Sequence, residues 1–285
     1  MKLRQTIKQK LIQYLKINHF LSHFKTTEPT KIINQSVPNL ELGCEIPYKI
    51  LVGTHHKTGT AWLSSIFKSI CNYHSLIYYE GKQDNLPEQF DLFFQDHSKF
   101  DFSSWKTPFR GVHMIRDPRD VIVSGCFYHK KSREEWLHKP RKEFNGLTYQ
   151  QKINSYSDIN DQILFEMENV GKGNIDDMLN WNYIHPSFYE IKYEDLIEDT
   201  NLMLFHEIFN FLEFPGKVIP SLLAISYNNS LFSGKLQQSV HIRSGKKSQW
   251  KQYFKQIHKE RFWDLFNNAL IKLGYEQDHN WMQTE

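Results

Sequence analysis

A lysine, two threonines and one glycine follow a short apolar run that has the length of a buried strand. The run is YKILVGT over residues 48–54, and Lys57, Thr58, Gly59 and Thr60 come just after it, before a segment of helical periodicity. Where a strand enters a helix through a tight loop, the unpaired N–H groups of the first helical turn and the helix dipole favour an anion. Glycine lets the backbone approach closely, lysine adds a charge and threonine adds a hydroxyl donor. The loop is therefore predicted to bind a phosphate-like group.

The order of these residues differs from that of a nucleoside triphosphatase. The pattern there is GxxxxGK[ST], in which the lysine follows the last glycine and a hydroxyl binds Mg²⁺. Here Lys57 precedes Gly59, and no Ser or Thr follows a Gly-Lys pair in the loop. A nucleotide kinase or triphosphatase is therefore the alternative, and Mg²⁺ dependence of activity would distinguish it.

A second strand-to-helix transition carries an arginine where the strand ends. The stretch RGVHMIRDPRDVIVSGCFYHK covers residues 110–130, with a proline in the first turn of the expected helix. Arg116 can bind a phosphate in bidentate fashion. Ser124 lies two turns into the helix, on the side that faces back to the strand end. Arg119 and Asp120 are interpreted as structural.

The first loop resembles the 5′-phosphosulfate-binding loop of the sulfotransferase family, which usually reads PKSGTTW. His56 stands where the family usually has proline, and Ala61 replaces the second threonine, which removes one hydroxyl. The resemblance implies that the cofactor is bound by Lys57, Thr58, Gly59, Thr60, Ala61 and Trp62, with the Trp62 ring stacking on the base.

Two further blocks match the segments that bind the 3′-phosphate in this family. Arg116 and Ser124 correspond to the arginine of RxPxD and to the serine eight residues later. The stretch VHIRSGKKSQWKQYF resembles the C-terminal RKGxxGxWK segment, so that Arg243, Ser244 and Gly245 take the R-K-G positions. Serine in place of lysine removes one charge from this clamp.

The resemblance implies transfer of a sulfuryl group from 3′-phosphoadenosine 5′-phosphosulfate (PAPS) to a hydroxyl or amine by in-line attack, leaving the product PAP. Such chemistry requires positioning and charge stabilisation. Lys57 would stabilise the leaving oxygen, and Tyr193 in YEIKYEDLIED matches the tyrosine that contacts adenine. No metal is required by this scheme, and none is predicted.

The acceptor must lose a proton, so a general base is needed beside the loop. The family uses a histidine or, in some branches, a glutamate. His97, in FFQDHSKF, follows the strand-like run DLFFQ and is the predicted base because imidazole titrates near neutral pH. Glu80, at the end of SLIYYE, is the alternative, and His113 is interpreted as structural.

Alternation of strand-like and helical segments predicts a single α/β domain with a central parallel sheet flanked by helices. The expected strands are residues 48–54, 75–79, 91–95, 110–115 and 187–193, and the expected helices include 62–71, 121–130 and 202–212. The predicted sulfotransferase domain covers residues 46–275. Within it, the polar segment 131–175 is too long for an ordinary connection and is interpreted as a helical insertion or lid over the acceptor site.

Residues 1–40 are interpreted as a basic amphipathic helix and its lead-in. The part over residues 1–24 could contact a membrane surface or a partner, although packing on its own domain is the commoner arrangement. This segment lacks the apolar core of a secretory signal, and no stretch approaches the roughly 20 apolar residues of a membrane span. With three cysteines and no CxxC pair, the sequence favours free thiols and a cytoplasmic protein.

Composition limits the partners. The net charge of +3 arises from 35 basic and 32 acidic residues, which gives no bulk electrostatic argument for nucleic-acid binding. The acceptor is expected to be a small molecule, a lipid or a carbohydrate. The family dimer motif KxxxTVxxxE is half kept, since Lys255 and Gln256 replace its Thr-Val centre, so the oligomeric state stays open. A non-catalytic nucleotide-binding protein of the same fold is the remaining alternative; Lys57 and His97 argue against it.

Overall fold

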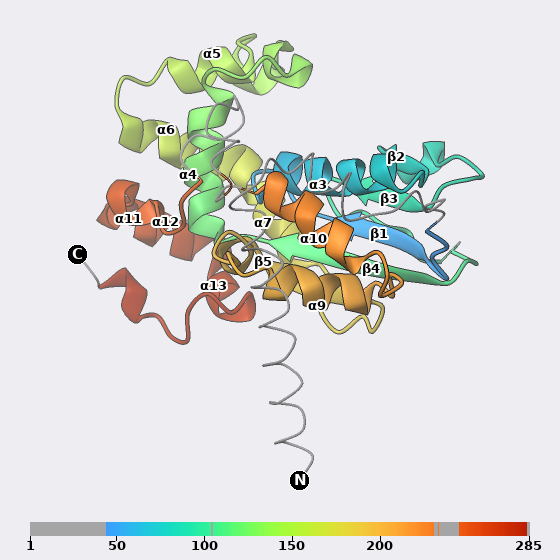
Figure 1. Cartoon of the computed structure of the whole chain (residues 1–285). Coiled ribbons are helices and arrows are strands. Elements are labelled where there is room, and N and C mark those ends of the chain that lie inside the picture. The colour runs from blue at the N-terminus through green and yellow to red at the C-terminus, as the bar shows by residue number, and fades with distance from the viewer. Residues whose placement is uncertain (1–43, 104, 231–232, 234–244, 284–285) are drawn as a thin grey trace.

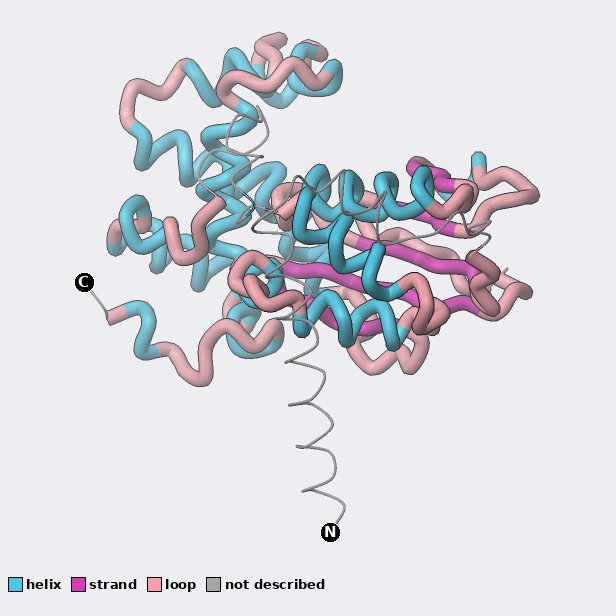
Figure 2. The backbone as a smooth tube through the Cα atoms, viewed as in Figure 1, coloured by secondary structure: helices cyan, strands magenta, loops and turns pink. Residues whose placement is uncertain are grey.

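The computed structural model describes residues 44–103, 105–230, 233 and 245–283. Its centre is a sheet of five parallel strands in the order β2-β3-β1-β4-β5, with helices packed around it (Figure 1, Figure 2). The strands are β1 (Lys49–Gly53), β2 (Tyr78–Glu80), β3 (Leu92–Gln95), β4 (Phe109–Ile115) and β5 (Phe188–Lys192). The predicted α/β fold with a parallel central sheet is confirmed.

The helices of the described part of the chain lie between these strands and after the last of them. They are α3 (Thr60–Tyr73), α4 (Pro118–His129), α5 (Tyr149–Asn154), α6 (Ile159–Glu166), α7 (Lys172–Leu179), α8 (Tyr193–Leu196), α9 (Met203–Phe211), α10 (Ile219–Asn228), α11 (Trp250–Tyr253), α12 (Gln256–Phe266) and α13 (Ala269–Lys272). A π-helical turn, η4 (Met167–Gly171), joins α6 to α7. Short 3₁₀ turns are η1 (Gln83–Asn85), η2 (Glu135–His138), η3 (Lys142–Phe144) and η6 (Asn280–Met282).

Both faces of the sheet are covered, which explains the continuous apolar character of its strands. Ile50 and Val52 of β1 point into a hydrophobic core shared with α3, α9 and α10. Leu51, on the opposite face, packs in a mainly aromatic cluster with Phe93 and Phe188. The central strand is thereby fixed in place from both sides.

A second body of helices packs around α4. Its core contains fully buried side chains from α4, α5 and α12, among them Ile122, Tyr149 and Phe262. Figure 1 shows α5 and α6 gathered around the end of α4 that is remote from the sheet, and α11 and α12 alongside the same helix. The expected segment 131–175 thus contains η2, η3, α5, α6 and η4, and its helical structure continues into α7. Its role as a lid stays a prediction.

Most expected elements have counterparts in the structure. The helical segments 62–71, 121–130 and 202–212 correspond to α3, α4 and α9. The strand expected over 75–79 was displaced, because Ser75 adopts a left-handed φ of 56° and the ladder of β2 begins only at Tyr78. The expected helix at residues 1–40 lies outside the described residues.

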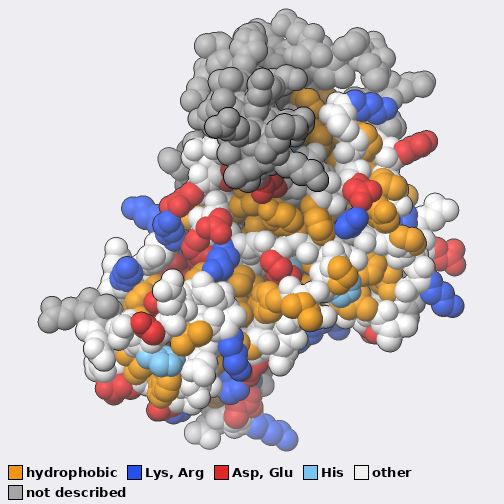
Figure 3. All heavy atoms as spheres, turned by 90° about the horizontal axis from the view of Figure 1, so that it is seen from below, with side chains coloured by type: hydrophobic (Ala, Val, Ile, Leu, Met, Phe, Trp, Pro, Cys, Tyr) orange, Lys and Arg blue, Asp and Glu red, His pale blue; other side chains and the backbone are white. Residues whose placement is uncertain are grey.

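The described helices include none with the length and apolar character needed to cross a bilayer. On the face shown in Figure 3, acidic and basic side chains are interspersed with apolar ones. Cys44, Cys71 and Cys126 are all buried thiols outside any disulfide, as the sequence predicted.

Candidate active site

The register of the sheet brings the expected functional segments to one edge. Gly53, the last residue of β1, pairs with Gln95 of β3 and with His113 of β4, and Ile115 of β4 pairs with Lys192 of β5. The segments that follow these strands therefore leave the sheet at neighbouring points, as parallel topology requires. These segments carry Lys57, His97, Arg116 and Tyr193.

The loop between β1 and α3 is closed by its own threonines. The Thr58 hydroxyl donates to the carbonyl oxygen of His55 at 2.7 Å and accepts from the His55 N–H at 3.0 Å. The Thr60 hydroxyl lies 2.9 Å from the same carbonyl oxygen and 2.9 Å from the Thr54 hydroxyl. Because Thr58 is fully buried, its hydroxyl serves the shape of the loop.

The backbone of this loop adopts left-handed conformations at two positions. Gly59 has φ 104°, and a Cβ atom there would lie 2.8 Å from the Tyr193 ring. Lys57 has φ 67°, which is uncommon for a residue with a side chain and is often found at functional sites. Glycine is therefore required at position 59 for two reasons. Its backbone conformation is left-handed, and the Tyr193 ring leaves no room for a Cβ atom.

The N-terminus of α3 is suited to an anion. Gly59 caps this 14-residue helix without a side-chain hydrogen bond, and its first turn contains no acidic residue. The N–H groups of Trp62 and Leu63 bond back to the Gly59 carbonyl oxygen. The N–H groups of Thr60 and the exposed Ala61 precede them, in the position where helix N-termini bind phosphate or sulfate.

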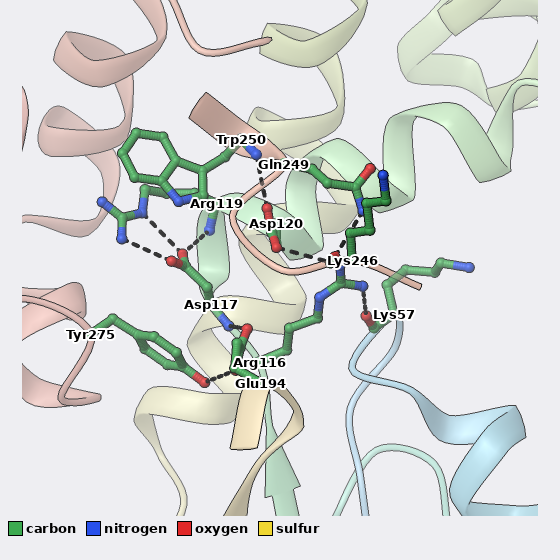
Figure 4. Close-up of polar contacts among 10 residues, drawn as sticks. All are labelled: Lys57, Arg116, Asp117, Arg119, Asp120, Glu194, Lys246, Gln249, Trp250 and Tyr275. Carbon is green, nitrogen blue, oxygen red and sulfur yellow. Dashed lines mark hydrogen bonds and ion pairs between the residues drawn. The ribbon is translucent and has the colours of Figure 1, made fainter. Parts of the chain in front are cut away.

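Arg116 lies beneath the same loop, at the end of β4 (Figure 4). Its Nη1 donates to the Lys57 carbonyl oxygen at 3.2 Å, and its Nη2 lies 3.4 Å from the Lys246 carbonyl oxygen and 3.5 Å from Asp120 Oδ2. The guanidinium stacks on the Tyr193 ring, 4.5 Å from its centroid. These bonds are long, and the buried Nε has no hydrogen-bond partner among the described residues. An arginine with one unused donor is suited to a phosphate group.

Asp120 connects this arginine to the C-terminal segment. Its Oδ1 accepts a hydrogen bond from the Trp250 N–H at 2.8 Å, and the carboxylate is buried. Burial raises the pKa of Asp120, and the Arg116 charge acts in the opposite direction. Asp120 therefore holds the chain that begins at Gly245, whose φ is 61°, against the end of β4. Arg243 and Ser244 lie outside the described residues.

Arg119 forms a separate, structural cluster that points away from Lys57 in Figure 4. It binds both carboxylate oxygens of Asp117, at 3.0 and 2.8 Å, and pairs with Glu276 at 2.6 Å. Its guanidinium also lies over the Trp250 ring, 3.8 Å from the centroid. This arrangement agrees with the structural role that the sequence suggested for Arg119.

Ser124 and Trp62, two further predicted cofactor residues, differ in their hydrogen bonds. Ser124 is partly buried in α4, and its hydroxyl bonds none of the described residues. Trp62 is buried in the core over the sheet, where its Nε1 donates to the Asn229 carbonyl oxygen at 2.7 Å. Its ring meets Tyr193 edge-to-face at 6.0 Å. Their contacts with a nucleotide stay predictions.

The candidate base His97 follows β3 and reaches the Lys57 loop. Its ring lies parallel to that of His56, with centroids 6.5 Å apart, and its side chain is 44% exposed. Glu80 ends β2, where its carboxylate accepts hydrogen bonds from the hydroxyls of Ser64 and Tyr78 at 3.1 and 3.0 Å. Of the two, His97 is in ring contact with the loop that holds Lys57.

Two histidines of the loop itself have paired partners that the sequence analysis missed. His55 Nε2 shares a hydrogen bond with His113 Nε2 at 2.8 Å, and His113 Nδ1 lies 2.6 Å from Glu190. His56 Nε2 is 2.8 Å from His129 Nε2. The adjacent pair His55-His56 was the only local signal. The interpretation of His113 as structural agrees with its complete burial.

Burial controls the charge of these groups. It lowers the pKa of His55 and His56 well below the ordinary value, and neighbouring histidines act in the same direction. It also lowers the pKa of His113 to about 3 and raises that of Glu190 to about 7. The loop histidines are therefore neutral at pH 7, when they can accept hydrogen bonds.

Lys57 is positioned by an aromatic ring. Its Nζ lies 3.5 Å from the centroid of Tyr128, in α4. The Tyr128 hydroxyl donates to Glu134 Oε1 at 2.8 Å, and the Trp136 Nε1 donates to Glu134 Oε2 at 2.6 Å. The segment after α4 is thus linked to the lysine through one tyrosine.

Within the described ranges, no group of three or more His, Cys, Asp or Glu residues could hold a metal ion.

The fold is that of a parallel α/β protein in which a strand-loop-helix turn follows the central strand β1. The sulfotransferase domain family model matches residues 47–274, and the chain belongs to that family. No curated protein sequence matches the chain.

Solved structures resemble this one at low sequence identity. A mouse sulfotransferase, SULT7A1, complexed with PAP, is 16% identical, with a TM-score of 0.51 over 87% of this chain and 91% of that one. A retinol dehydratase in complex with androsterone and inactive cofactor PAP is 17% identical, with a TM-score of 0.45 over 81% and 83% of the two chains. At such identities the likeness concerns the fold.

Proposed function

We propose that this protein transfers a sulfuryl group from PAPS to a hydroxyl or amine of an acceptor. PAPS supplies the sulfuryl group and a nucleotide leaving group. The chain supplies an anion-binding helix N-terminus at α3, the cation Lys57, and Arg116 with one unused donor. The 3′-phosphate is assigned to Arg116, Ser124 and the segment that contains Gly245.

In this proposal the residues act by position and charge. Lys57 stabilises the negative charge that develops on the oxygen between phosphate and sulfur as that bond breaks. His97 accepts the proton of the attacking group. Tyr193 and Trp62 form the aromatic floor near the base of the nucleotide, and Gly59 keeps the loop backbone close to it.

One observation supports the proposal most strongly. The Lys57 loop and Arg116 come from two separate strand ends, yet Arg116 donates directly to the Lys57 carbonyl oxygen. The two groups expected to bind the 5′ and 3′ ends of one nucleotide are therefore neighbours. A strand-to-helix turn that binds no ligand does not require a buried arginine beneath it.

Binding of PAP tests the proposal directly. A ligand that binds only the folded protein stabilises it by about 2.7 kcal/mol at a concentration one hundred times its dissociation constant. We expect such an increase in thermal stability with PAP, and a smaller one with adenosine 5′-phosphosulfate, which lacks the 3′-phosphate. An unchanged melting temperature at saturating PAP would refute the proposal.

The acceptor and the place of action form part of the same proposal. A screen of small-molecule, lipid and carbohydrate acceptors with PAPS carrying labelled sulfate identifies the acceptor class. A cytoplasmic location is supported by three buried cysteines that form no disulfide.

A further inference from the structure

A chain of hydrogen bonds leads from the Lys57 loop into the helices around α4. His56 Nε2 lies 2.8 Å from His129 Nε2, and His129 Nδ1 lies 2.8 Å from Glu166 Oε2. The Tyr149 hydroxyl donates to the same Glu166 oxygen at 2.8 Å. Of these four side chains only His56 is not fully buried.

The backbone around Glu166 is shaped to admit its carboxylate. A Cβ atom on Gly125, one turn before His129 in α4, would lie 2.4 Å from Glu166 Oε1. Glu166 ends α6, and the π-helical turn η4 begins at the next residue. A Cβ atom on Gly171, at the end of that turn, would lie 2.9 Å from the Glu166 carbonyl oxygen. π-Helical turns inside α-helices are frequent at functional sites.

We infer that His56, His129 and Glu166 form a proton relay that removes the acceptor's proton from the sulfuryl-transfer site. This inference rests on the proposed function and adds a second base to it. His56 is adjacent to Lys57, and its ring lies parallel to that of His97. The two imidazoles therefore stand together at the edge of the sheet where the acceptor must approach.

The hydrogen-bond partners assign the proton positions. Glu166 as a carboxylate accepts from His129 Nδ1–H, which leaves His129 Nε2 without a proton in the neutral ring. The proton between the two histidines then belongs to His56 Nε2, and His56 Nδ1 has a free lone pair. No described residue bonds this Nδ1, so it is available to an acceptor hydroxyl.

The relay step balances in atoms and electrons. The acceptor oxygen forms a bond to sulfur, and the bond from sulfur to the bridging phosphate oxygen breaks with its electron pair on the nucleotide. The acceptor's proton moves to His56 Nδ1, the His56 Nε2 proton to His129 Nε2, and the His129 Nδ1 proton to Glu166 Oε2. Each imidazole ends neutral in its other tautomer, and Glu166 ends as a carboxylic acid.

Burial gives this route an advantage over a single imidazole. The pKa of His56 is held well below its ordinary value by burial, by His129 and by the Lys57 charge. A proton kept on His56 would therefore create an unfavourable buried cation next to Lys57. Transfer of this proton to the Glu166 carboxylate instead neutralises a negative charge that is already buried there.

The tautomers can be measured without an acceptor. Histidine ¹⁵N NMR of the full chain with bound PAP should show His56 protonated at Nε2 and bare at Nδ1, and His129 with the opposite pattern. A His129 that carries both protons, or a His56 protonated at Nδ1, would overturn the relay.

The kinetic test uses Glu166→Gln in the parent and in a His97→Ala background. Glutamine retains an acceptor oxygen for His129 and Tyr149 but cannot take the proton. In the His97→Ala background we expect Glu166→Gln to lower kcat for an alcohol acceptor at least tenfold. With 4-nitrophenol at about pH 8.5, where this phenol is largely ionised, we expect a change below twofold. KM and the dissociation constant of PAP should stay within twofold of the parent's.

Glu168→Gln is the matched control, because Glu168 lies two residues away with an exposed ion pair to Arg261 and should leave kcat unchanged. The inference fails if Glu166→Gln lowers kcat equally for the alcohol and for 4-nitrophenol, or if it leaves both unchanged. It also fails if His97→Ala alone removes all turnover. A parent that neither binds PAP nor sulfates any acceptor refutes the proposed function, and the tautomers still decide the hydrogen-bond assignment.

Discussion

The carbonyl oxygen of Lys57 accepts a hydrogen bond from Arg116 Nη1 at 3.2 Å, although the two residues are 59 positions apart in the sequence. The bond joins the loop after β1 to the end of β4 and places two cations at one site. Tyr193, from the segment after β5, supports both, because its ring lies under Gly59 and under the Arg116 guanidinium. The segments that follow β1, β4 and β5 are thus in direct contact with one another without a ligand.

Replacing Arg116 by alanine should weaken PAP binding by roughly 1.5 to 3 kcal/mol, the range for hydrogen bonds to a charged group. The variant should also lose its preference for nucleotides that carry a 3′-phosphate. Isothermal titration with PAP and with adenosine 5′-phosphosulfate measures both effects. Arg110→Ala, on the same strand but paired with Glu213, is the control and should bind like the parent. An unchanged ratio of the two affinities in Arg116→Ala would exclude Arg116 as the 3′-phosphate ligand.

Lys57→Ala and His97→Ala should separate cofactor binding from proton transfer. Lys57→Ala should lower both turnover and PAP affinity, since in the proposed function the lysine contacts the nucleotide and its leaving oxygen. His97→Ala should keep PAP affinity and lower turnover by roughly two to four orders of magnitude, the span of general base catalysis. Binding and turnover are measured on both variants with one accepted substrate. Near-parental turnover in His97→Ala together with a loss in Glu80→Gln would assign the base to Glu80.

Gly59→Ala should destabilise the protein and impair PAP binding. Its left-handed φ costs a residue with a Cβ about 1–2 kcal/mol, and the clash with Tyr193 adds a comparable overpacking cost. Gly146→Ala isolates the first effect, because Gly146 has φ 83° and nothing within 4 Å of its Cβ position. Urea unfolding should therefore show a larger loss for Gly59→Ala than for Gly146→Ala. Equal losses would mean that Tyr193 yields to the added methyl group.

Stability should fall as the pH decreases from 7.5 to 5.5. The folded-state pKa values of His55, His56 and His113 are all depressed from 6.5 by burial, so the unfolded chain takes up protons near pH 6.5 that the folded chain does not. Each such proton lowers the free energy of unfolding by about 1.4 kcal/mol per pH unit below that value. Burial also lowers the pKa of His74, His206 and His258, which adds to the trend. Glu190, whose pKa burial raises from 4.5 to about 7, acts in the opposite direction, and so do the raised pKa values of Asp120, Glu194 and Asp199. The six histidines outnumber these four carboxylates. Urea midpoints at three pH values measure the trend, and a midpoint that rises on acidification would contradict it.

The sequence by itself determined the parts of this protein that depend on neighbouring residues. Strand-length apolar runs separated by helical segments specified the parallel sheet, because such strands must be buried on both faces. A lysine and a glycine after one strand, and an arginine at the end of another, marked the candidate anion site, because parallel strands end at a common edge. These features depend on residues that are close in the sequence, so the sequence alone reveals them.

The tertiary structure decided which side chains meet across that edge. His56 and His129 are 73 positions apart, and His129 and Glu166 are 37 apart; their hydrogen bonds depend on how α4 and α6 pack, which no local pattern encodes. The Thr58 and Thr60 hydroxyls matched an anion-binding motif, yet both lie within hydrogen-bonding distance of the His55 carbonyl oxygen, because a turn this tight must satisfy its own buried backbone groups. Residue types and spacing therefore located the candidate site, and packing determined which of its side chains contact one another.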